Sequence, residues 1–262
     1  MRSVMITGAS RGIGLEFVRQ YLADGYKVYA TCHKIAGAEH LMALPSNGPG
    51  QIDVIEMDVT SAAQVKAVAK RLNGIPIDVL INNAGTVEPI FYGSGAYEGN
   101  DDPDLRNYDF DAWLELLKTN VLGPARVCGV PSSTIFRPVS AQLLSILSST
   151  LASIGTTWQA GRYAYRTSKA ALNMLTRSIG EWYAKRGIIL VSISPGWTLI
   201  VRGNTEVMDS RLAPRRQVQG GRVNLTASAR TGSPFTRSGC RRQAPSRCRS
   251  RPCCRAGRTR PG

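Results

Sequence analysis

Short apolar runs alternate with amphipathic stretches along the first 198 residues of the chain. Buried strands are predicted by apolar runs at 2–7, 26–31, 52–57, 77–81, 143–147 and 188–193. Helices are predicted by apolar residues at helical spacing over 13–23, 61–72, 109–127 and 163–185. Strands that alternate with helices are typical of a parallel sheet covered on both faces. We therefore expect residues 1–198 to form one α/β domain, a Rossmann-type, doubly wound parallel sheet in three α/β/α layers.

Two stretches interrupt this pattern. In 128–140, Gly129, Pro131 and Pro138 end the preceding helix early. After Leu199 little periodicity remains, and Arg, Ser, Pro, Gly and Cys dominate the end of the chain. We expect 199–262 to be a basic tail of low order.

The charge is divided unevenly between these two regions. The chain carries a formal net charge of +15, and the tail alone holds 15 Arg, no Lys and two acidic residues. Residues 1–198 hold the remaining 18 basic and 16 acidic residues, so the domain is close to neutral. A basic protein can bind nucleic acid. This tail lacks interleaved aromatic residues and a recognisable module, so nucleic acid is not the expected partner.

The apolar and cysteine patterns bear on location and on metals. No apolar run reaches the length of a membrane span, and the chain opens on a strand pattern instead of a secretory signal. The expected location is therefore a reducing cytoplasm, with no membrane partner. Four of the six cysteines lie in the tail, but no His follows His40 and Cys253 is adjacent to Cys254. We expect no metal site.

A glycine-rich turn lies between the first strand and the first helix. Glycines let the backbone approach a pyrophosphate, and the free N–H groups at a helix start attract anions. The alternative is an ordinary flexible turn. The residues predicted to hold a dinucleotide here are Gly8, Ser10, Arg11, Gly12 and Gly14.

The end of the second strand indicates the type of dinucleotide. A carboxylate there would hold the ribose hydroxyls of NAD. This chain has Thr31, Cys32, His33 and Lys34 instead. Because Arg11 and Lys34 suit a 2′-phosphate, NADP is favoured over NAD, and His33 is a further predicted cofactor contact. The alternative is that these side chains are solvated surface charges.

Polar residues follow the third and fourth strands, at the carboxyl edge of the sheet where ligands bind in this architecture. Asp58 is suited to accept a hydrogen bond from an adenine amino group, or it caps the turn before Ser61. The run Asn82-Asn83-Ala84-Gly85 follows the fourth strand and lies at the same edge.

Tyr165 and Lys169 are four residues apart in a predicted helix, so they share one face. A free phenol has a pKa near 10, too high for efficient acid–base chemistry at neutral pH. A nearby ammonium favours the ionised phenol and lowers that value. Tyr165 is then able to exchange a proton with a substrate oxygen. Tyr163 is the nearest rival, but it is six positions from Lys169. Most Tyr–Lys pairs at this spacing are simply helix surface.

Together, these motifs resemble the short-chain dehydrogenase/reductase family. Thr7 to Gly14 matches the TGxxxGxG turn, Asn82 to Gly85 the NNAG segment, and Tyr165 to Lys169 the YxxxK pair. The run from Tyr163 and the turn Pro195-Gly196-Trp197 look like the C-factor/sniffer-type carbonyl reductase branch. The resemblance covers residues 1–127 and 141–198.

The resemblance implies a role for each matching residue. Tyr165 would be the acid/base, and Lys169 would bind the nicotinamide ribose. Ser149, with Ser148 as the fallback, would hold the substrate carbonyl oxygen, and Asn120 would support Lys169 through a water. The implied cofactor contacts also include Ile13, Asp58, Val59, Asn82, Ala84, Gly85, Pro195 and Gly196.

The chain departs from the family pattern after Trp197. A Thr that contacts the carboxamide is expected at the position of Ile200, and Thr198 is two residues early. The substrate-covering helix and the seventh strand are not recognisable, and 128–140 does not match either. Translation in a shifted reading frame would explain both faults, and a genuine disordered basic tail is the rival explanation. Family members commonly form dimers or tetramers, so a homo-oligomer is implied, but its usual contacts come from the missing part.

Three functions follow from these observations. The first is an NADP-dependent oxidoreductase that acts on a small carbonyl or alcohol, of the carbonyl reductase type. The second is a dinucleotide-binding remnant whose catalysis is impaired because the substrate lid is missing. The third, nucleic-acid binding by the tail, would give strongly salt-dependent affinity. The sequence favours the first.

Overall fold

The computed structural model describes residues 1–45, 48–87, 104–130, 142–157 and 160–195, all within one compact unit, Met1–Ala229. Gly196 and the tail 199–262 lie outside the described residues. So does most of the irregular stretch 128–140 and of the polar loop between 86 and 107.

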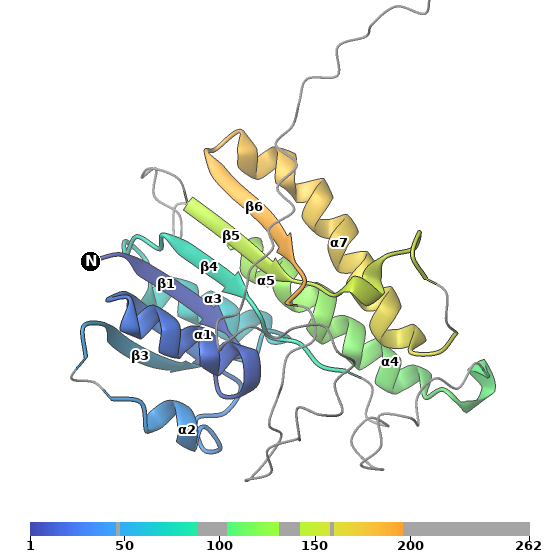
Figure 1. Ribbon diagram of the computed structural model, residues 1–262, viewed down its shortest axis with the longest axis horizontal. Helices are drawn as coiled ribbons and strands as arrows, with labels where there is room; N and C mark the ends of the chain where they lie inside the picture. Colours follow the sequence, from blue (N-terminus) through green and yellow to red (C-terminus); the bar gives the residue numbers. More distant parts are fainter. Residues whose placement is uncertain (46–47, 88–103, 131–141, 158–159, 196–262) are drawn as a thin grey trace, which may run out of the picture. The chain divides into compact units, whose positions relative to one another are not determined.

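The described residues form one six-stranded parallel sheet (Figure 1). Its spatial order is β3-β2-β1-β4-β5-β6, and every neighbouring pair is parallel. The expected α/β fold class is confirmed. The strands are β1 (Ser3–Thr7), β2 (Lys27–Cys32), β3 (Gln51–Glu56), β4 (Val79–Asn82), β5 (Gln142–Leu147) and β6 (Ile188–Ile193).

The strand order reverses between β1 and β4. The chain builds outward from β1 to β3, then returns to the other side of β1 and builds outward to β6. All five residues of β1 are buried, because helices cover both faces of a central parallel strand. A crevice for a ligand is expected at the carboxyl ends of β1 and β4, where the order reverses.

Helices cover the two faces of the sheet (Figure 1). Leu15, Val18 and Leu22 of α1 pack on one face, together with Leu41 of α2. Residues of α3, α5 and α7 pack on the other face in a second core cluster. The helices are α1 (Gly12–Ala23), α2 (Glu39–Met42), α3 (Ala62–Arg71), α4 (Phe110–Leu117), α5 (Gly123–Cys128) and α7 (Tyr163–Ala184).

Coverage is unequal at the β6 edge of the sheet. Ile188 is buried against the α7 side, whereas Ile189, which points to the opposite face, is 53% exposed. Among the described helices, only α1 and α2 contribute to the core on that opposite face. Six strands are seen in the described residues, and the seventh strand of the family pattern is not among them.

The helix expected over 109–127 is interrupted. Asp109 caps α4 by accepting hydrogen bonds from the backbone of Asp111 and Ala112. A π-helical turn, η3 (Lys118–Leu122), then separates α4 from α5. Pro124 explains the interruption, because it has no N–H to donate to the carbonyl of Asn120.

Smaller differences concern the ends of elements. β4 begins at Val79 instead of residue 77, and the short helix α2 was not expected from the sequence. Ser61 caps α3 as predicted, accepting from the backbone N–H of Gln64. In the part of the chain that the structure describes, no helix has the length and apolar character needed to cross a bilayer.

Candidate functional site

The glycine-rich turn after β1 is shaped by close backbone contacts. Gly8 has φ +66°, a conformation that side chains disfavour. A Cβ at Gly14 would lie 2.2 Å from the Gly8 carbonyl oxygen, so only glycine fits there. The N–H of Ala9 donates to the Thr31 carbonyl at 2.8 Å, which ties the turn to β2. The turn thus presents its backbone and the start of α1 at the carboxyl edge of the sheet, as a pyrophosphate requires.

Asn83 joins this turn to the end of β4. Its Nδ2 donates to the carbonyl oxygens of Thr7 and Gly8, each at 2.9 Å. In return, the Thr7 hydroxyl accepts from the backbone N–H groups of Asn83 at 3.1 Å and Ala84 at 3.0 Å. The sequence reading named Asn82, Ala84 and Gly85 as cofactor residues and missed this function of Asn83. The Asn-Asn doublet after a strand was the available signal.

Asn82 has a different position from its neighbour. Its side chain is 2% exposed, and its Nδ2 donates to the Cys128 sulfur at 3.5 Å. Burial raises the pKa of the Cys128 thiol to about 12. The side chain of Asn82 therefore lies in the core and does not face the open edge of the sheet.

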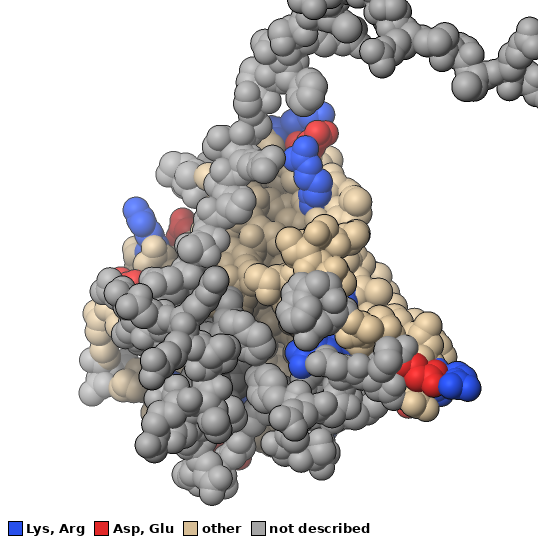
Figure 2. All heavy atoms as spheres, turned by 45° about the vertical axis from the view of Figure 1, so that its right-hand side comes forward, with Lys and Arg blue, Asp and Glu red and all other residues tan. Residues whose placement is uncertain are grey.

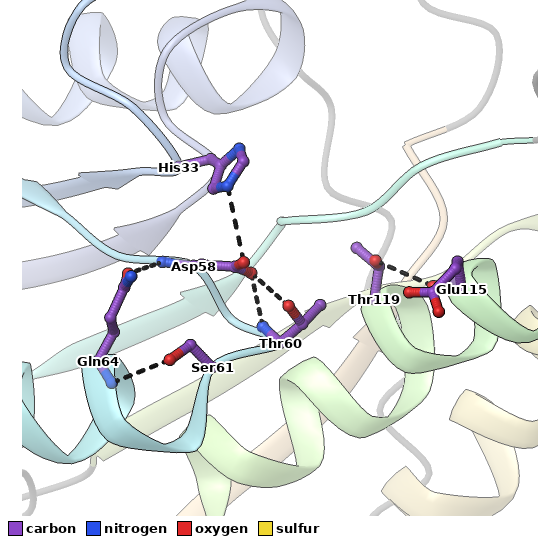
Figure 3. A network of polar contacts seen from close by, with 7 residues as sticks. All are labelled: His33, Asp58, Thr60, Ser61, Gln64, Glu115 and Thr119. Carbon is purple, nitrogen blue, oxygen red and sulfur yellow. Dashed lines mark hydrogen bonds and ion pairs between the residues drawn. The ribbon is translucent and has the colours of Figure 1, made fainter.

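Asp58 and His33 come together at the ends of β3 and β2 (Figure 3). His33 Nε2 lies 3.6 Å from one carboxylate oxygen of Asp58. The other oxygen accepts from the backbone N–H and the hydroxyl of Thr60, both at 2.8 Å. The two predictions for Asp58, a turn cap and a ligand contact, are thus compatible. One oxygen holds the turn, while the other faces an exposed histidine.

Val59 and Gly123 fix the spacing between the Asp58 turn and α5. A Cβ at Gly123 would lie 2.8 Å from Val59 Cγ2. Val59 is buried, with its side chain close to Gly123.

Several other predicted cofactor residues are at least partly exposed. Ser10, Ile13 and Pro195 are partly buried, and Arg11 and His33 are exposed. Figure 2 shows that charges of both signs are scattered over one face of the described residues, in keeping with the nearly neutral domain.

Lys169 is buried beside Tyr165 on the first turns of α7. Its ammonium donates to the Leu147 carbonyl at 2.9 Å and lies 5.7 Å from the centre of the Tyr165 ring. Burial lowers the pKa of Lys169 to about 8. Tyr165 itself is only partly buried. The ring of Tyr163 instead lies 5.4 Å from that of Tyr108.

Asn120 is locked in place by the π-helical turn η3. Its side chain is 1% exposed. Its Oδ1 accepts from the Thr86 N–H and its Nδ2 donates to the Thr86 carbonyl, both at 2.8 Å. Nδ2 also lies 3.1 Å from the Ser168 hydroxyl. The π turn therefore places Asn120 between the end of β4 and α7.

Gly85 lies where these groups meet. A Cβ there would be 3.2 Å from Asn120 Oδ1 and 3.6 Å from Lys169 Nζ, and the residue itself is exposed. The fold thus brings Gly85, Asn120 and Lys169 together from three separate segments. A side chain at Gly85 would restrict the space next to Lys169, so glycine keeps that space open.

The two candidate serines differ in surroundings. Ser149 is partly buried, and its hydroxyl accepts from the Leu151 N–H at 3.2 Å, which caps the short turn η4 (Thr150–Ala152). Ser148 is buried, and its hydroxyl has no hydrogen-bond partner among the described residues. Ser149 is the more accessible of the two, which agrees with its being the first choice.

Comparisons with known proteins point to one family. The family model described as short chain dehydrogenase matches residues 2–210. The 3-oxoacyl-[acyl-carrier-protein] reductase FabG of Salmonella typhimurium is 28% identical over 224 residues, which cover 84% of this chain and 82% of the relative. The reductase MabA of Mycobacterium tuberculosis, which has the same description, is 27% identical over 236 residues, covering 89% and 81%.

Solved structures give a similar result. A carbonyl reductase from Pseudomonas aeruginosa PAO1 in complex with NADP is 29% identical, with a TM-score of 0.63 over 76% of this chain and 84% of that one. A Burkholderia multivorans protein with bound NADP is 32% identical, with a TM-score of 0.64 over 75% and 79%.

Proposed function

The chain belongs to the short chain dehydrogenase family, and we propose that it is an NADP-dependent oxidoreductase that interconverts a small carbonyl compound and its alcohol. The observation that carries this proposal is the buried ammonium of Lys169, held by the Leu147 carbonyl beside the Tyr165 ring. Burying a lysine without a carboxylate partner is costly, and such a cost is typical of functional sites.

The residues fit a nicotinamide dinucleotide. The turn from Gly8 to Gly14 admits close backbone approach, and the glycine at position 85 leaves open space next to Lys169. When bound, the nicotinamide supplies or accepts the hydride. The protein supplies the binding site, the orientation and the proton.

We assign the proton to the Tyr165 hydroxyl. The neighbouring positive charge of Lys169 favours the ionised phenol, so Tyr165 is able to give a proton to a carbonyl oxygen and take it back from an alcohol. Ser149 would hold that oxygen by a hydrogen bond, and Asn120 would position Lys169. Ser148 remains the fallback for Ser149.

NADP is proposed over NAD because basic residues replace an acid at the end of β2. His33 and Lys34 are exposed there, and Arg11 is exposed at the start of α1. Within the described residues, the only carboxylate at ion-pair distance from His33 is that of Asp58. The two similar structures described above contain bound NADP.

The proposed substrate class is a small ketone or aldehyde, including 3-oxoacyl compounds. The relatives are named as 3-oxoacyl reductases, and one similar structure is named as a carbonyl reductase. Both names describe the reduction of a carbonyl group. We propose that residues 1–198 form the catalytic domain. A reading-frame shift is the proposed origin of the tail, and a helix–strand pattern in another frame of the coding DNA would support it.

The deciding experiment mixes the full chain with NADPH or NADH and a panel of aldehydes, ketones and 3-oxoacyl thioesters, then follows the loss of reduced-nicotinamide absorbance. We expect turnover with NADPH that falls by about a thousandfold in Tyr165→Phe, since general acid–base groups contribute about 10²–10⁴-fold. Tyr163→Phe is the matched control and should retain turnover. Binding of NADPH without turnover of any substrate would instead support a catalytically impaired remnant.

A further inference from the structure

A hollow lies between α3 and the end of α5, away from the residues of the dinucleotide site. Its volume is about 450 Å³, which falls within the range of small-molecule sites. It shares no lining residue with the turn after β1, with the Asp58 turn or with the Tyr165–Lys169 pair. Nothing in the proposed reaction uses it.

Three basic side chains converge on this hollow. Lys66 and Lys70 are four residues apart on α3, so they lie on one face of that helix, and Arg126 of α5 lines the same hollow. No carboxylate lines the hollow, and within the described ranges none of the three forms an ion pair. Like charges four residues apart destabilise a helix. A bound anion would offset this repulsion.

The neighbouring Arg71 makes the contrast clear. It pairs with Asp53 at 2.9 Å, so α3 has a carboxylate partner for one of its cations. The cations that face the hollow are the ones left without such a partner.

Arg126 gives a second, independent indication. Its Nη1 is buried and has no hydrogen-bond acceptor among the described residues. A buried charged donor without an acceptor is costly. An oxygen of a bound anion would supply that acceptor.

The remaining surface of the hollow is largely apolar. Val65, Ala69 and Val130 are buried and contribute to its lining. An inorganic ion would leave these side chains without a contact. A ligand with an acidic group and an aliphatic part would pair with the basic side chains and pack against the apolar ones.

We propose that this hollow is a binding site for a small organic anion, with its acidic group at Lys66, Lys70 and Arg126 and its aliphatic part against Val65, Ala69 and Val130. The carboxylate and phosphate forms of such a ligand share this chemistry. The proposal does not depend on the proposed reaction, because the two sites have no residue in common.

The test is calorimetric titration of the full chain with octanoate, octyl phosphate and octan-1-ol, with NADPH absent and then saturating. We expect the anions to bind about tenfold more tightly than the alcohol or better, with affinity that falls as salt is raised. The ratio between the two anions identifies the preferred acidic group. Saturating NADPH should leave the binding unchanged, whereas competition would place the anion in the cofactor site and overturn the proposal.

Substitutions locate the site. The double variant Lys66→Gln/Lys70→Gln changes exposed helix positions to another good helix former, so it should fold. We expect it to weaken octanoate about tenfold, and Arg126→Gln to do at least as much. Lys185→Gln, an exposed lysine outside the lining, is the control. Equal octanoate affinity in the folded double variant and in the control would refute the site, as would no anion binding to the unmodified chain.

Discussion

The two halves of the sheet edge hold their functional groups in different ways. At the carboxyl ends of β1 and β2, positions are set by backbone sterics, as at Gly8 and Gly14, where a Cβ would collide with neighbouring atoms. Across β4 and β5, positions are set by buried polar side chains from distant segments, such as Asn120, Ser168 and Lys169. In the first half, tightly packed backbone atoms fix the shape of the proposed binding surface. In the second half, the Lys169 ammonium is buried, and burial disfavours the charged form that the proposed chemistry needs.

This contrast predicts that substitutions in the first half cost stability and cofactor affinity together. In the second half, replacing the buried Lys169 should remove turnover while stability is unchanged or rises. The following predictions test that division, starting with the largest effect.

Gly14→Ala should be the most damaging change. The added Cβ would lie 2.2 Å from the Gly8 carbonyl oxygen and 2.5 Å from Asn83 Nδ2, so the turn must deform. We expect a loss of about 3 kcal/mol in the free energy of unfolding, at the upper end for overpacking. Urea unfolding and NADPH titration measure the two effects. Gly37→Ala is the control, because no atom lies within 4 Å of a Cβ there. Similar losses in both variants would contradict the steric account.

Lys169→Met should stabilise the chain at neutral pH while it removes turnover. The pKa of Lys169 is lowered by burial from 10.5 to about 8 in the folded state, which corresponds to a cost of about 3 kcal/mol for the buried charge. That cost is fully present below pH 8. It falls between pH 8 and 10.5, because the unfolded state still holds the proton that the folded state has released, and it is absent above pH 10.5. The gain in the variant should therefore be largest at pH 7 and smaller at about pH 9.5.

Urea unfolding of the cofactor-free chain at both pH values measures this gain. Lys185→Met, at an exposed position, should show no such dependence. A variant that is less stable than the unmodified chain at pH 7 would mean that Lys169 stabilises the fold, which would remove the contrast between the halves.

Asn83→Ala and Asn120→Ala compare the amide that holds the turn of the first half with an amide of the second half. Asn83→Ala leaves the carbonyl oxygens of Thr7 and Gly8 without their donor, and we expect a loss of about 2 kcal/mol in stability together with weaker NADPH binding. Asn120→Ala should lower turnover more than NADPH affinity, because Asn120 contacts Thr86 and Ser168 next to Lys169. Equal changes in affinity and turnover for the two variants would show that the halves act as one unit.

Sequence alone predicted the sheet and its longer helices, but not α2 or the π turn, because periodicity and glycine turns are local signals. It predicted Asn120 only through the family resemblance, since that residue depends on a π turn and on partners 34 and 48 positions away. It assigned Asn82 and missed Asn83, because two adjacent asparagines at a strand end look alike in a sequence. Only the fold shows that one points into the core and the other reaches the turn. The hollow between α3 and α5 also joins segments with no shared motif.

Arg11→Ala tests the proposed NADP preference and should have the smallest effect of the series. Arg11 is exposed at the start of α1 and makes no ion pair within the described residues, so its loss should not change stability measurably. If its guanidinium contacts the 2′-phosphate, affinity for NADPH should fall about tenfold, or about 1.4 kcal/mol, while affinity for NADH is unchanged. Fluorescence titration with both cofactors gives the ratio. Arg19→Ala is the control, because Arg19 lies on the same helix but pairs with Glu16. If Arg11→Ala weakens NADPH and NADH equally, Arg11 binds a group that both cofactors share, and the 2′-phosphate must be held from the β2 side by His33 and Lys34.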